Sequence, residues 1–353
     1  MIYIDTSSYH QVNNQDKSVE MIYFDAIQKL YNSATKFRLG NKSKLLKQFF
    51  NDCCDKELLG ELGLIHEKTI LKNLILMSPE KIEKLVAEID VSKFRDDFNK
   101  LRKKKPNKED IELVPEKVKA AYLLKEQYQK SSGIMSQKVD SIRGGGQMNM
   151  FLVEILAITV CPYCNRNFIN NRGDKFSAQM DHFYSKDDYP FLAVSLYNLI
   201  PTCGACNHIK STQNFHIHPF LKPKQEDSFT FGYQYTSLGD MEIKIATSDR
   251  RKNDFEAIRL EEAYQIHHID VRNMLKREER YSKGYRKELQ ELFKSEVGGS
   301  SSIFNESFNL ELTNDEIDRM IYGDAIFEED IKNIPLGKFR KDIYKEIKSL
   351  RGY

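Results

Sequence analysis

The chain has 353 residues, of which 40% are hydrophobic and 30% are charged, and its formal net charge is +2. This length exceeds what one hydrophobic core usually organises, so two or three domains are expected. The composition excludes a fibrous or wholly disordered chain, and the near-neutral charge means that binding to nucleic acid would need local basic patches. Because no apolar stretch could span a bilayer and the first residues lack the features of a secretory signal, we expect a cytoplasmic protein with no membrane-bound part.

Residues 1–150 are predicted to form a helical N-terminal region. Apolar residues recur at three- and four-residue spacing from about residue 18 to residue 130. The basic run at 100–108 is typical of a solvated helix end and loop, and a phosphate-contacting patch is the open alternative. The three glycines at 144–146 indicate a hinge rather than a phosphate-binding loop, because no Gly-Lys-Ser or Gly-Lys-Thr follows them.

Residues 151–224 contain two Cys-x-x-C pairs, CPYC at 161–164 and CGAC at 203–206. In a large chain without a signal peptide, such pairs are typical of metal ligands rather than disulfides. Four thiolates complete the tetrahedral shell that zinc prefers and leave no open coordination position. The predicted structural zinc ligands are therefore Cys161, Cys164, Cys203 and Cys206. Cys53 and Cys54 lack this pattern and are expected to be small buried residues.

The 38 residues between the two pairs contain candidates for a second, catalytic site. Phosphodiester hydrolysis needs a base for the attacking water and a cation for the developing charge. Asp181 and Asn207 would offer oxygen ligands, which suit magnesium or manganese, and His182, with an ordinary pKa of about 6.5, would be the general base. Neighbouring residues of a strand point to opposite faces, so a bend would be needed for Asp181 and His182 to serve one site.

Three further residues complete this candidate site. Asn198 is expected to hold the intervening loop and so to position His182. Lys210 lies about one helical turn after Asn207, so both side chains could face one site. In that case Lys210 would contact a phosphate group of the substrate; the alternative is that Lys210 is a surface lysine. His218 precedes a proline that favours extended structure, and packing beside the site is favoured over a role as ligand or phosphate contact.

The order C-x-x-C, Asp-His, Asn, C-x-x-C-Asn resembles the zinc-containing HNH endonucleases, including the endonuclease VII type. The resemblance implies a ββα-metal fold, in which a β-hairpin and a helix hold one catalytic metal. It implies that Asp181 and Asn207 bind that metal, that His182 is the general base and that Asn198 is the central asparagine. Because the last position is Asn207 rather than a histidine, the site would be an H-N-N variant that favours magnesium.

A broader resemblance concerns the HNH subunits of Septu-type anti-phage systems. It is carried by DHFYSKDDYPFLAVSLYNLIPTCGACN, by the following HPF at 218–220 and by PLGKFRKDI at 335–343. This resemblance implies an effector nuclease of a defence system that works beside an ATPase partner.

Residues 225–353 are predicted to form a β-hairpin followed by helices. Aromatic residues alternate from 229 to 235, and a turn and the segment MEIKIA follow. Residues 253–295 indicate one or two long, charge-rich helices, and residues 298–302 (GGSSS) a loop. A capping box formed by Thr313 and Glu316 would open a short helix, and a last helix is expected at about 338–350.

The sequence thus predicts an α+β fold with mainly helical flanks around a zinc-braced ββα-metal module. The predicted function is that of an HNH endonuclease, a phosphodiester hydrolase acting on nucleic acid, with DNA favoured and RNA possible. Residues 161–224 suit this function, since they carry seven Lys or Arg against four Asp or Glu. The alternative is a non-catalytic zinc module that binds nucleic acid or a protein partner.

Overall fold

A computed structural model describes most of the chain, namely residues 2–11, 17–103, 107–129, 131–139, 146–173, 175–295, 312–327, 329 and 331–350. The predicted hinge, apart from residue 146, the predicted loop at 298–302 and residues 104–106 of the basic run lie outside these ranges. The fold is α+β, mainly helical with small antiparallel sheets, as predicted. Within the described ranges, each helix is too short or too polar to cross a membrane.

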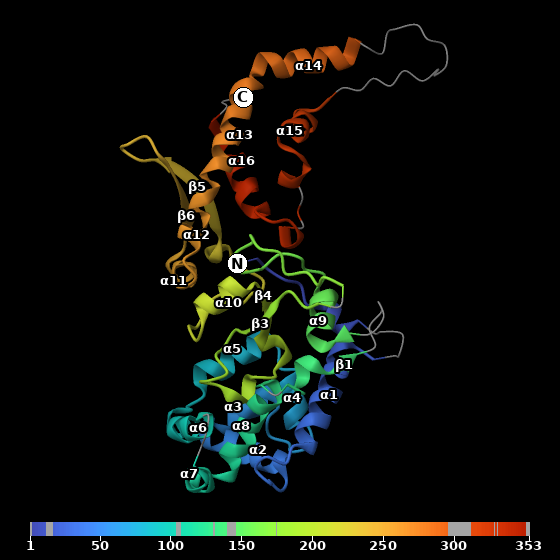
Figure 1. Ribbon diagram of the computed structural model, residues 1–353, viewed down its shortest axis with the longest axis vertical. Helices are drawn as coiled ribbons and strands as arrows, with labels where there is room; N and C mark the ends of the chain where they lie inside the picture. Colours follow the sequence, from blue (N-terminus) through green and yellow to red (C-terminus); the bar gives the residue numbers. More distant parts are fainter. Residues whose placement is uncertain are drawn as a thin grey trace, which may run out of the picture. The chain divides into compact units, whose positions relative to one another are not determined.

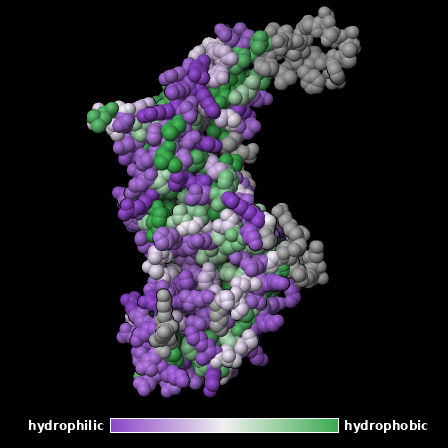
Figure 2. Space-filling view, viewed as in Figure 1, coloured by the Kyte–Doolittle hydropathy of each residue, from purple (hydrophilic) through white to green (hydrophobic). Residues whose placement is uncertain are grey.

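The chain divides into two compact units, Met1–Lys224 and Gln225–Tyr353. The first unit combines the helical region with both Cys-x-x-C pairs, so the division of this part at residue 150 stays a prediction. The face of the molecule in Figure 2 is mainly hydrophilic, with hydrophobic areas between the polar ones. Most large apolar side chains lie inside the units, where they form the cores.

Helices dominate the first part of unit 1, as the apolar spacing predicts (Figure 1). They are α1 (Val19–Ser33), α2 (Lys42–Cys53), α3 (Lys56–Leu62), α4 (Ile70–Ile75), α5 (Pro79–Glu88), α6 (Arg95–Arg102), α7 (Lys108–Leu113) and α8 (Glu116–Gln129). Side-chain oxygens of Ser18, Asn41 and Asp55 accept backbone N–H groups in the first turns of α1, α2 and α3. These hydrogen bonds satisfy donors that have no partner within the helix, so they fix where each helix begins.

Helix α8 joins the helical region to the segments that follow it. It packs against α2 and against the turn at 190–192. The Phe191 ring lies against the rings of both Phe49 and Phe50, with centroid distances of 5.6 and 5.3 Å. Hydrogen bonds support this packing, since the Ser195 hydroxyl donates to the carbonyl of Leu74 at 2.9 Å. The segments after residue 151 therefore share a buried core with the N-terminal helices.

The remaining elements of unit 1 are β1 (Lys138–Val139), β2 (Gly146–Gln147), α9 (Met148–Leu156), β3 (Gln179–His182), β4 (Leu199–Thr202) and α10 (Gly204–Lys210). Strands β3 and β4 pair antiparallel, from Gln179 opposite Thr202 to His182 opposite Leu199. Helix α10 follows β4 almost at once and contacts β3 (Figure 1). The segment between the two Cys-x-x-C pairs thus ends in a hairpin, and a helix follows that hairpin directly.

Unit 2 comprises β5 (Phe229–Tyr235), β6 (Met241–Thr247), α11 (Asp249–Ala257), α12 (Leu260–Tyr264), α13 (His268–Arg280), α14 (Lys283–Ser295), α15 (Asn314–Tyr322) and α16 (Gly337–Leu350). The predicted hairpin, the Thr313–Glu316 capping box and the final helix are confirmed. The prediction of one or two long helices at 253–295 is wrong, because this stretch contains several shorter ones. One break lies at Arg259, whose φ of 50° is left-handed and cannot continue a right-handed helix.

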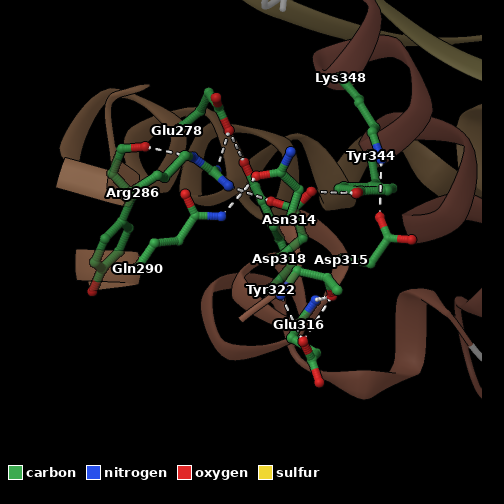
Figure 3. Close-up of polar contacts among 12 residues, drawn as sticks. Glu278, Arg286, Gln290, Asn314, Asp315, Glu316, Asp318, Tyr322, Tyr344 and Lys348 are labelled. Atoms are coloured by element: carbon green, nitrogen blue, oxygen red, sulfur yellow. Dashed lines mark hydrogen bonds and ion pairs between the residues drawn. The ribbon is translucent and has the colours of Figure 1, made fainter. Parts of the chain in front are cut away.

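A buried arginine ties the helices of unit 2 together (Figure 3). The Arg286 guanidinium on α14 forms ion pairs with Asp318 on α15 and Glu278 on α13. The hydroxyl of Tyr344 on α16 donates to the same Asp318 carboxylate. Because Asp318 is fully buried, its charge needs these partners, and the network fixes which helices lie together.

Candidate metal centre and catalytic site

The two Cys-x-x-C pairs meet in one cluster. The four Sγ atoms lie within 4.8 Å of one another, and all four cysteines are buried and free of disulfides. A tetrahedral zinc ion with Zn–S bonds of about 2.3 Å places its sulfur atoms about 3.8 Å apart, so the cluster has suitable dimensions. The Asn167 amide donates to Cys203 Sγ at 3.3 Å, as groups around metal ligands commonly do. The four cysteines could therefore hold a metal such as zinc.

Asp181 lies in β3 and forms a buried ion pair with Lys210 at the end of α10. Lys210 Nζ is 3.1 Å from Asp181 Oδ2, and the Tyr163 hydroxyl donates to the same oxygen at 2.7 Å. Burial raises the pKa of the Asp181 carboxyl, while Lys210 and Tyr163 oppose this rise. Lys210 is 0% exposed, so the alternative prediction, a surface lysine, is wrong. The sequence could not reveal this, because only the fold brings a carboxylate to Lys210.

His182 follows Asp181 but contacts other elements. Its Nε2 is 2.9 Å from the Ala193 carbonyl oxygen, and its ring centroid is 4.3 Å from that of Tyr128 on α8. A carbonyl only accepts, so Nε2 carries the hydrogen and Nδ1 keeps the lone pair of the neutral ring. Burial, reinforced by the Lys186 charge, lowers the pKa of His182 to about 3, well below the ordinary value expected from the sequence. The imidazole is therefore neutral at pH 7.

Asp181 and His182 do not share an open pocket. Both belong to the regular ladder of β3 and β4, without the bend expected between them, and they are 2% and 5% exposed. Asn207 is half-buried, and its amide donates to Gln179 Oε1 at 2.7 Å. It lines a surface pocket of about 340 Å³ with Tyr128, among others, whereas Asp181 and His182 do not line that pocket. The structure thus brings Asp181, His182 and Asn207 into one region, but it leaves Asp181 and His182 covered.

Asp181 and Asn207 can be compared with the ligands that a second, divalent cation requires. Asp181 and Asn207 offer a carboxylate and an amide oxygen, the hard donors that magnesium prefers. Asn207 contacts Gln179, two residues before Asp181 on β3, so both lie where α10 meets β3. The donor chemistry therefore fits a divalent cation. The Asp181 carboxylate already has Lys210 as its counter-ion, so a bound cation would compete with that ammonium group.

Asn198 is fully buried and bridges the loop between β3 and β4. Its Oδ1 accepts the Tyr184 N–H at 2.8 Å, and its Nδ2 donates to the carbonyls of Tyr184 and Leu192 at 3.1 and 3.0 Å. Leu192 immediately precedes Ala193, whose carbonyl holds the His182 ring. One amide side chain therefore connects the start of this loop to the segment that orients the imidazole.

Lys125, Tyr128 and Lys186 border this region and were not predicted from the sequence. Lys125 on α8 is 1% exposed and donates to Asp187 at 2.5 Å, and Arg102 on α6 lies 3.5 Å from the same carboxylate. Asp187 lies in a turn, as its residue type suggests, but it also fastens that turn to two helices. The one feature of the sequence that indicates the Lys125–Asp187 contact is the position of Lys125 within the apolar run of α8.

His218 packs beside the hairpin. Its ring centroid is 4.2 Å from that of Phe183, and its Nδ1 accepts the Phe220 N–H at 3.1 Å. Residues 216 and 217 lie in a bend, and residue 218 belongs to no helix or strand. Burial lowers the pKa of His218 to about 3, so this ring is also neutral at pH 7.

The fold and the site together define an α+β protein with a four-cysteine cluster suited to a metal ion. No family model matches the sequence, and no solved structure matches it. The chain is similar to the Septu protein PtuB of Bacillus thuringiensis, with 31% identity over 87 residues. The matched segment covers 25% of this chain and 32% of PtuB, so the chain spans about a third of the length of this relative.

Proposed function

We propose that this chain is an HNH-type endonuclease that hydrolyses phosphodiester bonds of nucleic acid, with DNA as the expected substrate and RNA as the alternative. The observation that carries the proposal is the place of His182, which is the last residue of β3 in a hairpin that leads directly into helix α10, at the start of which the second Cys-x-x-C pair of the four-cysteine cluster lies. A general base must be unprotonated to accept a proton, and the ring is neutral. Its pKa of about 3 also makes the covered ring a weak base, so the ring has to be uncovered, which raises this pKa, before it can serve in catalysis.

His182 would accept the proton of the attacking water at Nδ1, while the Ala193 carbonyl holds Nε2–H and keeps the ring oriented. Asn198 would act through the loop that it bridges, as a positioning residue. Because the ring is almost fully covered, Tyr128 or the loop between β3 and β4 has to move when substrate binds.

Asp181 and Asn207 would hold magnesium or manganese, and such a cation stabilises the negative charge that develops on the phosphate oxygens. Lys210 would then release the Asp181 carboxylate. A released ammonium at this position is suited to contact a phosphate of the substrate.

We further propose that the nuclease serves an anti-phage defence system and acts with an ATPase partner. The similarity to a Septu protein supports this role. Affinity purification of the tagged chain with the product of the neighbouring gene tests the partnership. A chain that purifies alone and is fully active by itself would contradict it.

The catalytic proposal is tested by comparing His182→Ala with His208→Ala, a matched change at an exposed histidine on α10. Each purified protein is incubated with labelled DNA and RNA, with magnesium, manganese or no added cation. We expect cleavage by the wild type and His208→Ala, and at least a 100-fold loss in His182→Ala, in line with removal of a general base. A folded, zinc-loaded His182→Ala protein with undiminished cleavage would overturn the mechanism.

A non-catalytic zinc module is the second candidate, and the burial of Asp181 and His182 favours it. In that case the protein would bind nucleic acid or a protein partner through its surface. Replacement of the cysteines would then abolish binding, while His182→Ala would bind normally and no variant would cleave.

A further inference from the structure

Three lysines surround the candidate general base. Lys186, Lys210 and Lys125 all act on His182 as neighbouring positive charges. Two of them have carboxylate partners, since Lys210 pairs with Asp181 at 3.1 Å and Lys125 pairs with Asp187 at 2.5 Å. The third, Lys186, differs from the other two because it forms no ion pair with a carboxylate in the described part of the chain.

Lys186 lies in the turn that follows β3, and its side chain is half-buried. Its ammonium nitrogen is 5.7 Å from the centroid of the Tyr128 ring, and this ring in turn lies against His182. Across the described ranges, no carboxylate forms an ion pair with this ammonium group. The adjacent Asp187 is already shared by Lys125 and Arg102.

A half-buried ammonium group without a counter-ion is costly, because it loses water without gaining an ion pair. Burial lowers the pKa of Lys186, and Lys125 and Lys210 add to this lowering, while the nearby carboxylates of Asp187 and Asp181 oppose it without forming an ion pair with the ammonium group. An anion that binds beside Tyr128 would remove the cost. A phosphodiester matches this position, since it is anionic and compact and is the group on which a nuclease acts.

We propose that Lys186 anchors a backbone phosphate of the nucleic-acid substrate, next to the phosphodiester that His182 would serve. The inference rests on the proposed nuclease function and adds a substrate contact to it. It assigns different tasks to the three lysines: Lys125 fastens the turn, Lys210 balances Asp181 until a cation takes its place, and Lys186 binds a backbone phosphate with or without the cation.

The test compares Lys186→Gln with Lys186→Arg, and with Lys68→Gln as a charge-matched control at an exposed position. Binding of a fluorescent double-stranded DNA and of single-stranded RNA is measured by anisotropy across a range of salt concentrations, without added divalent cation so that cleavage does not interfere. We expect Lys186→Gln to weaken DNA binding roughly fivefold to tenfold near 0.1 M salt, and to reduce the slope of log K against log salt by about 0.9. Lys186→Arg and Lys68→Gln should retain the affinity and slope of the wild type.

Because Lys186 forms no ion pair with the described carboxylates, Lys186→Gln should melt like the wild type and keep its metal. If it unfolds, Lys186→Met, which retains the alkyl chain beside Tyr128, replaces it in the same assay. Unchanged affinity and slope in either folded variant would overturn the inference and leave the His182→Ala cleavage test unaffected. Wild-type protein that binds polyglutamate as tightly as DNA, with the same loss in Lys186→Gln, would also overturn it and indicate an acidic protein partner.

Discussion

Lys210 and Asp181 form an ion pair that is closed off from solvent, with 3.1 Å between Nζ and Oδ2. Lys210 Nζ also donates to the His182 carbonyl at 2.9 Å, so one ammonium group holds the end of α10 against the last two residues of β3. Taking two charges out of water is expensive, and their attraction compensates only while both are present. This pair therefore makes the junction of β3 and α10 sensitive to the loss of either partner.

The first prediction concerns this pair. Lys210→Met should lower the free energy of unfolding by about 3–5 kcal/mol, because it leaves a buried carboxylate without its counter-ion. Adding Asp181→Leu should recover part of the loss, since the double variant removes both buried charges of this pair. Chemical denaturation of the three proteins measures both effects. Equal stability of Lys210→Met and the wild type would show that the pair is not closed off in solution.

The second prediction concerns the cysteine cluster. Cys203→Ser should lose the bound metal and destabilise unit 1 severely, since a structural zinc site supplies about 10 kcal/mol or more of binding free energy to folding. Cys53→Ser is the matched control, because Cys53 is also buried but lies outside the cluster. Metal content by mass spectrometry and thermal melting give the readout. Metal-free wild-type protein that melts like the purified form would contradict a structural ion.

The third prediction concerns Asn198. Asn198→Ala removes three buried hydrogen bonds and leaves backbone groups of Tyr184 and Leu192 unsatisfied. We expect a loss of about 2–4 kcal/mol in stability. Any cleavage should fall as well, because the segment that orients His182 is no longer fixed. Asn207→Ala, at the half-buried position on α10, should cost less than 1 kcal/mol in stability, and denaturation of both variants compares them.

The fourth prediction concerns pH. His218 has a folded-state pKa of about 3, below its unfolded value of about 6.5, so protonation favours the unfolded chain. The contribution of His218 is complete above pH 6.5 and declines as the pH falls toward 3. Between pH 7.5 and 5.5 the wild type should lose about 1.4 kcal/mol more stability than His218→Phe. Parallel pH dependence of the two proteins would show that His218 is not buried in its neutral form.

The sequence predicts those features that depend on residues close together along the chain. Cys161 and Cys203 could be assigned because their pairs have a characteristic spacing, and Thr313 because its cap partner lies three residues away. The burial of Lys210 and the ion pair of Lys125 could not be predicted, since their partners come from other elements. The low pKa of His182 has the same origin, because Tyr128 and the loop that cover it depend on the complete fold.

The four-cysteine cluster also has a consequence for the order of folding. Its two pairs are separated by 38 residues, and this loop contains both paired strands. Closing a loop of this length costs conformational entropy before strand contacts can compensate. A metal ion that binds the four thiolates early brings the two ends of this loop together before β3 and β4 pair. We therefore expect the hairpin to form slowly in the metal-free chain and faster in the metal-bound chain.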